Sequence, residues 1–209
     1  MAKPNKDGKT LVQFNVKDAV YSVEGETASV KPLTYMNTFT KDRNISVKNI
    51  YGDGELQDSL YSDKSITGAI GTTARDMDFE KDIGLVENID NGNVAELAVT
   101  SAVRVNFGFQ TEYKEKGQPV KVKKVWLLNV QITAPNESLT QNQDDITEST
   151  YDYNYTGYGV NLKSSDGLSD YVDESGQTKK VFTVSSKPGD ANYETFLDSV
   201  PKPKVAADV

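Results

Sequence analysis

Apolar and polar side chains alternate along most of the chain between residues 11 and 162. A period of two is typical of strands that bury one face and expose the other. Turn signals such as Gly52-Asp53-Gly54 and Asn91-Gly92 separate several of these segments. The alternating segments cover residues 12–17, 28–35, 45–51, 65–73, 99–110, 122–132 and 146–162. The pattern predicts a protein built mainly of antiparallel strands.

The two clearest strands, residues 99–110 and 122–132, flank a charged loop that contains Gly117 and Pro119. Apolar residues at every second position in both segments predict a long antiparallel hairpin with one face toward a core. The residues that we expect in this core are Val105, Phe107, Phe109, Trp126, Leu128 and Val130.

Helical spacing occurs in one short segment, where Phe79, Ile83 and Val86 recur after a candidate N-cap at Asp76 or Asp78. We therefore expect a single helix of at most about three turns. Residues 163–180 are rich in Ser, Asp and Gly and predict a loop, followed by one short strand at 181–185.

Together these elements predict an all-β fold, a β sandwich of two antiparallel sheets, with one short flanking α-helix and extended terminal arms. The expected organisation is a flexible N-terminal arm (1–10), a sandwich domain (11–162), a C-terminal extension (163–200) and a flexible tail (201–209). The two ends are expected to be flexible because neither shows a hydrophobic period.

Composition argues against an enzyme. The chain has no His and no Cys, so the commonest general base, thiol nucleophiles and thiolate metal sites are absent. It also lacks a Gly-x-Ser-x-Gly elbow and a phosphate-binding Gly-x-x-x-x-Gly-Lys-Ser/Thr loop. We expect no catalytic residues, no cofactor and no metal. Without a signal-peptide h-region or a run of about 20 apolar residues, we also expect cytoplasmic folding and no membrane anchor.

The formal net charge is −8. Duplex binding requires clustered Lys and Arg that neutralise phosphates, so we expect no specific DNA binding. The excess acid has two explanations: it keeps the protein soluble, or it forms an acidic wall that lets DNA slide past.

Carboxylates cluster at Asp53, Glu55 and Asp58. Two interpretations remain, a solvated or interface loop and a calcium site, and the missing EF-hand pattern favours the loop. A stripe of alternating tyrosines within 151–155 predicts either cross-strand packing or a contact between subunits. The candidate inter-subunit contacts are Tyr51, Asp53, Glu55, Tyr151, Tyr153 and Tyr155.

The order of motifs from Tyr35 to Leu162 resembles the major tail protein family of long, non-contractile-tailed phages of Gram-positive bacteria. An N-terminal strand precedes an aromatic, acidic turn, a strand that leads into an acidic helix, and a paired hairpin. A Thr- and Tyr-rich strand ends the series. The corresponding segments here are 12–16, 50–55, 66–85, 105–109, 123–130 with Ala134-Pro135, and the strand ending near Val160.

This resemblance implies a structural virion protein, the tail tube subunit. Six copies would form a ring and lend strands to a shared inner barrel, and the rings would stack into a tube. Its partners would be further copies of itself and the tape measure, tail tip and tail terminator proteins. DNA would pass through the lumen during ejection without specific binding. A non-enzymatic adhesion or carbohydrate-binding β-sandwich module is the alternative function.

Overall fold

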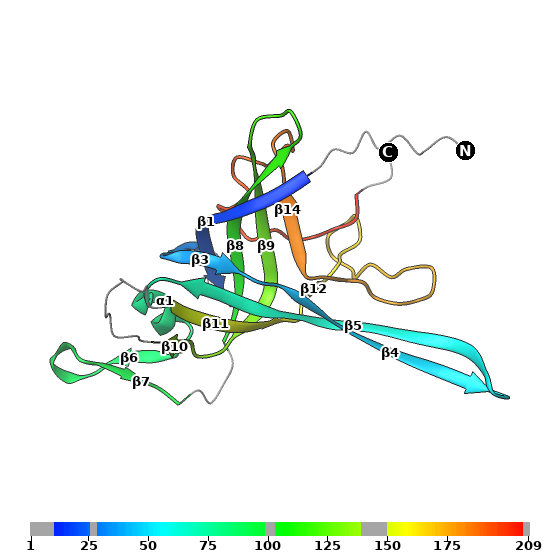
Figure 1. Ribbon diagram of the computed structural model, residues 1–209, viewed down its shortest axis with the longest axis horizontal. Coiled ribbons are helices and arrows are strands. Elements are labelled where there is room, and N and C mark those ends of the chain that lie inside the picture. Colours follow the sequence, from blue (N-terminus) through cyan, green and yellow to red (C-terminus); the bar gives the residue numbers. More distant parts are fainter. Residues whose placement is uncertain (1–10, 26–28, 99–102, 139–149, 207–209) are drawn as a thin grey trace, which may run out of the picture.

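The computed structural model describes residues 11–25, 29–98, 103–138 and 150–206 (Figure 1). Antiparallel strands dominate it, and the described residues contain one short α-helix, so the all-β prediction is confirmed. The strands are β1 (Leu11–Val23), β2 (Lys31–Leu33), β3 (Met36–Phe39), β4 (Asp42–Gly52), β5 (Glu55–Thr72), β6 (Val86–Asn88), β7 (Val94–Glu96), β8 (Arg104–Glu115), β9 (Lys121–Ile132), β10 (Asn136–Ser138), β11 (Thr150–Gly157), β12 (Val160–Asn161), β13 (Lys180–Val181) and β14 (Thr183–Ser186). The helix α1 spans Met77–Asp82, and a 3₁₀ turn, Asp90–Gly92, joins β6 to β7.

The main sheet has the strand order β2-β1-β8-β9-β11-β5-β3. Strand β9 pairs with β14 through residues 124–127 and with β11 through residues 130–132. Its second edge is thus divided between two strands, and the sheet bends there. In Figure 1, β5 and β11 cross β8 and β9, so the two antiparallel layers are parts of one continuous hydrogen-bonded sheet.

The main core lies between these layers. Phe39 on β3 packs on Phe109 on β8, with ring centroids 4.5 Å apart. Helix α1 closes the core by placing the buried Phe79 edge-on to Tyr21 at 4.7 Å. Asp76, one of the two predicted candidates, is the N-cap, and its carboxylate accepts a hydrogen bond from the Phe79 amide at 3.1 Å.

All six residues predicted for the core are buried, but they do not share one face. Val105, Phe107, Phe109 and Val130 belong to the main core, whereas Trp126 and Leu128 pack in a second cluster with Phe196 and Leu197. Asn129 has a φ of 54° and marks a bulge where the pairing of β8 and β9 shifts. Because an extra residue reverses the alternation, the one-face prediction for β9 was wrong.

The C-terminal extension belongs to the same domain. Strand β14 completes the sheet beside β9, and the Trp126 indole N–H donates to the Phe196 carbonyl at 2.8 Å. The part of the expected tail that the structure describes is also held, because the Lys163 amide donates to the Pro203 carbonyl. The residues of this segment that pack with Trp126 and Leu128 on the outer face of β9 are Val181, Val184, Phe196, Leu197 and Val200. The predicted boundary at residue 162 is therefore not a domain boundary.

Candidate assembly interface

A long hairpin extends from the body of the protein. Strand β4 pairs with β5 from Asp42↔Thr67 to Gly52↔Glu55, whereas β11 pairs with β5 only through residues 66–72 and β3 only through residues 70–72. We call residues 42–65 the arm. At about 3.3 Å per residue, its outer part reaches roughly 30 Å beyond the sheet. Figure 1 shows it projecting away from the other described elements.

A two-residue turn forms the tip of the arm. Gly52 pairs with Glu55, and the residues between them, Asp53 and Gly54, have φ angles of 53° and 82°. Positive φ at both central positions defines a type I′ turn, for which Asp-Gly is a preferred sequence. The turn predicted from Gly52-Asp53-Gly54 is therefore present, and it fixes the register of the arm.

The arm exposes large apolar side chains on both of its faces. Val47 lies opposite Tyr61, and Tyr51 lies opposite Leu56, so each pair shares a face. Exposed fractions reach 66% for Tyr51 and 74% for Tyr61. The exposed large apolar residues of the arm are Ile45, Val47, Ile50, Tyr51, Leu56, Leu60 and Tyr61. A concentration of exposed apolar side chains of this kind is typical of an interaction surface.

The two outer backbone edges of the arm are also unpaired within the described part of the chain. Among the described strands, none pairs with the outer edge of β4 or with the second edge of residues 55–65 of β5. Two open edges offer unpaired N–H and C=O groups to another chain. An isolated two-stranded hairpin is only marginally stable in water, so this arm is suited to gain further strands from a partner.

The six predicted contact residues fall into three exposed, two buried and one half-buried residue. Tyr51, Asp53 and Glu55 lie together at the exposed tip of the arm. Tyr153 and Tyr155 are buried, so a contact with another subunit is wrong for both of them. Tyr151 is half-buried at the start of β11.

Hydrogen bonds within the core explain the burial of the two tyrosines. The Tyr153 hydroxyl donates to the Glu80 carboxylate at 2.7 Å, and the Tyr155 hydroxyl donates to the Thr40 carbonyl at 2.8 Å. Burial raises the pKa of both phenols above the ordinary tyrosine value, and the hydrogen bond to Glu80 raises that of Tyr153 further. The stripe thus serves cross-strand and core packing, one of the two functions predicted for it.

The calcium alternative gains no support. Among the residues that the structure describes, no group of three or more acidic side chains is arranged to hold a metal ion. An Asp58 carboxylate oxygen instead accepts a hydrogen bond from the Ser59 amide at 2.7 Å.

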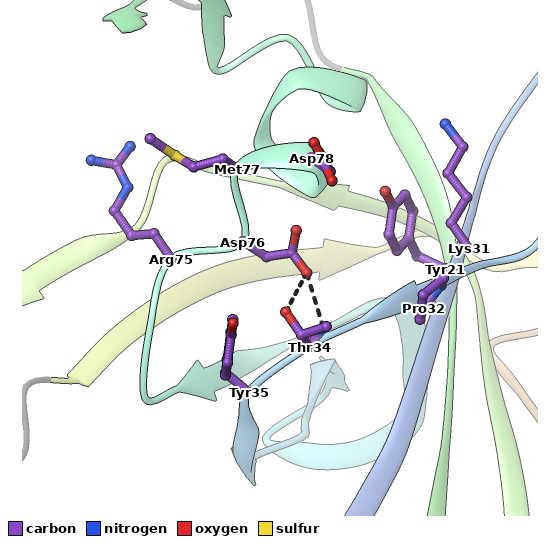
Figure 2. Close-up of a pocket in the computed structure, with 9 residues that line it drawn as sticks. All are labelled: Tyr21, Lys31, Pro32, Thr34, Tyr35, Arg75, Asp76, Met77 and Asp78. Carbon is purple, nitrogen blue, oxygen red and sulfur yellow. Dashed lines mark hydrogen bonds between the residues drawn. The ribbon is translucent and has the colours of Figure 1, made fainter.

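A hollow of about 480 Å³ lies beside the start of α1 (Figure 2). Asp76 points toward Thr34 in it and accepts hydrogen bonds from the Thr34 amide at 2.9 Å and hydroxyl at 2.8 Å. Lys31 is paired with Asp82 at 2.6 Å, and Arg75 is paired with the buried Glu80. Because Lys31 and Arg75 pair with acids of α1 and Asp76 binds Thr34, the hollow is explained by its structural role in joining α1 to the sheet.

Sequence reasoning missed part of the arm surface. It predicted strands at 45–51 and 65–73, but β5 begins at Glu55, so Leu56, Leu60 and Tyr61 are strand residues. The signal that would have found them is the apolar series 56, 60, 61 directly after the Asp-Gly turn.

No protein-family model and no curated protein matches this sequence. The described part of the chain has no helix of the length and apolar character that a membrane span requires.

Proposed function

We propose that this chain is a non-enzymatic structural subunit that assembles with copies of itself through the arm. The observation that carries the proposal is a hairpin with two open edges and seven exposed large apolar side chains. A protein that functions as a monomer would keep this surface exposed to water and open to aggregation. Pairing arms from neighbouring copies would cover the apolar faces and complete the backbone hydrogen bonds.

The geometry of such pairing favours a closed ring. The outer edge of β4 and the second edge of β5 are different surfaces, so joining them between copies is a head-to-tail contact. Head-to-tail contacts form rings when the rotation closes and filaments when it does not. A ring of arms would be a shared β-barrel that leaves no open strand edge.

The resemblance to phage major tail proteins supports a more specific assignment, the tail tube subunit. Six copies would then form each ring, and stacked rings would form the tube of a virion tail that is assembled in the host cytoplasm. The tape measure protein would set the length, and the tail tip and terminator proteins would bind the two ends. Enclosing a channel for DNA requires no catalytic group, cofactor or metal, which agrees with the lack of His and Cys.

Negative-stain electron microscopy of the purified protein over a range of concentrations tests the proposal. We expect rings or tubes above a critical concentration. A protein that remains monomeric at every concentration, also with a tail-tip complex as nucleus, would contradict it. A monomer that binds glycans would instead support the adhesion module.

A further inference from the structure

An apolar groove of about 310 Å³ opens at the root of the arm. It lies where β1, β3, β8 and β9 come together, and Phe14 on its rim is 41% exposed. Its apolar lining consists of Phe14, Val16, Phe39, Phe109, Val125 and Leu127. A groove with this lining is suited to receive apolar side chains from a partner.

Positive charge gathers around the same groove. Lys41 and Lys123 line it, and Lys187 lies close to Lys123. Burial lowers the pKa of the Lys123 ammonium, and repulsion from Lys187 and Lys41 lowers it further. Within the described ranges, no carboxylate forms an ion pair with any of these three lysines. Three like charges beside an apolar groove favour an occupant that carries acidic groups.

Glu112, an acid on the groove side, does not fill this role. Asn15, which lines the groove, donates to the Glu112 carboxylate at 3.4 Å, and Lys17 pairs with Glu112 at 2.7 Å. That carboxylate is therefore neutralised by Lys17.

The tip of the arm has the complementary composition. Tyr51 and Leu56 lie opposite each other at its end and are 66% and 55% exposed. Asp53, Glu55 and Asp58 surround this pair in the sequence and are exposed. One aromatic and one aliphatic side chain among three carboxylates match an apolar groove among three lysines.

The tip cannot occupy the groove of its own chain. Lys41 directly precedes the arm, so the groove lies at the root, roughly 30 Å from the tip along two extended strands. Residues 1–10 are poor occupants for a chemical reason. They carry Lys3, Lys6 and Lys9 against the single Asp7, so the groove lysines would repel them.

We infer that the acidic tip of the arm of one copy docks into the lysine-lined groove of a second copy. This inference rests on the proposed self-assembly and adds a second contact between copies to the pairing of arm edges. Tyr51 and Leu56 enter the groove, and Glu55 and Asp58 lie toward Lys41 and Lys187. Since tip and groove are different surfaces about 30 Å apart, the contact is head-to-tail and extends from copy to copy.

Charge exchange tests the docking. We expect Glu55→Lys/Asp58→Lys to raise the critical concentration for assembly at least about tenfold, because like charges then face each other. Lys41→Glu/Lys187→Glu is expected to have the same effect. The chain that carries all four changes is expected to assemble again near the wild-type concentration. Matched controls, Glu87→Lys/Asp90→Lys and Lys180→Glu/Lys202→Glu, change exposed residues elsewhere and are expected to leave assembly unchanged.

Cross-linking identifies the surfaces directly, because the chain contains no native Cys. Two differently tagged populations, Tyr51→Cys and Phe14→Cys, are mixed and oxidised, and the products are separated by size. We expect a disulfide between the two populations, with little coupling within either one. A third population, Leu168→Cys, carries a thiol at a more exposed position outside both surfaces and serves as the control. Predominant Tyr51–Tyr51 coupling, or coupling of Phe14→Cys to Leu168→Cys as readily as to the tip, would overturn the inference.

The outcomes separate this inference from the proposed function. Tubes that form without the mixed disulfide, and that tolerate both charge reversals, would keep the tube assignment and overturn the docking. The mixed disulfide in small oligomers that never form rings or tubes would keep the docking and overturn the tube assignment. A wild-type chain that does not assemble, together with Cys variants that form no mixed disulfide, would overturn both.

Discussion

Replacing Tyr61 by Ser tests the proposed role of the arm in assembly separately from its role in folding. Tyr61 is 74% exposed and lies opposite Val47 in the arm, far from the main core. In the free subunit the change removes one cross-strand pair, which costs at most about 1 kcal/mol of local stability. Because the arm can unfold locally while the core stays folded, we expect the melting temperature to fall by less than about 4 °C.

The expected effect on assembly is larger. A whole tyrosine buries about 200 Å², so covering the exposed 74% would remove about 150 Å² from water. At about 25 cal/mol per Å², this contributes about 3–4 kcal/mol for each subunit. Only part of such burial becomes affinity, and we expect the critical concentration to rise at least about tenfold. Sedimentation of the assembled fraction against total protein measures it.

A matched substitution controls for lost surface hydrophobicity. Leu168 is 83% exposed and lies outside the arm, so Leu168→Ser is expected to change neither the melting temperature nor the critical concentration. The reasoning is refuted if Tyr61→Ser assembles at the wild-type concentration. It is also refuted if the free variant melts as low as a variant of the core, because the arm would then be part of the folded body.

Three further predictions concern the fold and the charge. Trp126→Phe keeps an aromatic ring but leaves the Phe196 carbonyl without its donor, so unfolding in urea should show a loss of about 1–3 kcal/mol; wild-type stability would mean that this bond does not hold the segment. Burial raises the pKa of Asp82, but hydrogen bonds from Lys31 and Tyr21 outweigh it, so the folded pKa lies below the ordinary 3.8. The stability that this ionised carboxylate contributes is present at neutral pH and is lost as the pH falls through its folded pKa. Asp82→Asn should therefore be less stable than wild type at neutral pH and should lose less stability in an acid titration. An identical acid transition would contradict this. With an excess of acidic groups, neither subunit nor assembly should shift duplex DNA in a gel at about 0.15 M salt; micromolar binding that weakens steeply with salt would refute this.

Sequence periodicity predicted the elements whose alternation is uninterrupted. Phe107 and Phe109 have the expected face, Asp76 caps the helix, and Asp53-Gly54 forms the expected turn. Each depends on residues close together in the chain, where local chemistry decides the conformation.

The errors occur where bulges reverse the alternation. Asn15 and Asp18 have positive φ, and the register of β1 against β8 shifts near both. Val12 and Phe14 are therefore exposed, although their parity predicted a buried face. Asn129 causes the same reversal in β9. Asn and Asp tolerate this conformation, but they occur equally well in regular strands and loops, so the sequence alone does not identify a bulge.

The tyrosine stripe shows a second limit. The sequence could not distinguish core packing from a subunit contact, because the difference depends on Glu80 and Thr40, which approach Tyr153 and Tyr155 from 73 and 115 residues away. The C-terminal segment was misplaced for the same reason, since its contacts with β9 are distant in sequence.

The hydrogen bond between Trp126 and Phe196 also sets the order of events during synthesis. The two residues are 70 positions apart. At about 5–20 residues per second, a ribosome needs roughly 4–14 s to add the segment that covers Trp126 and Leu128. During that interval the outer face of β9 stays uncovered and accessible to chaperones. A chain cut short before Phe196 would lack the residues that cover Trp126 and Leu128, so this face of β9 would stay exposed.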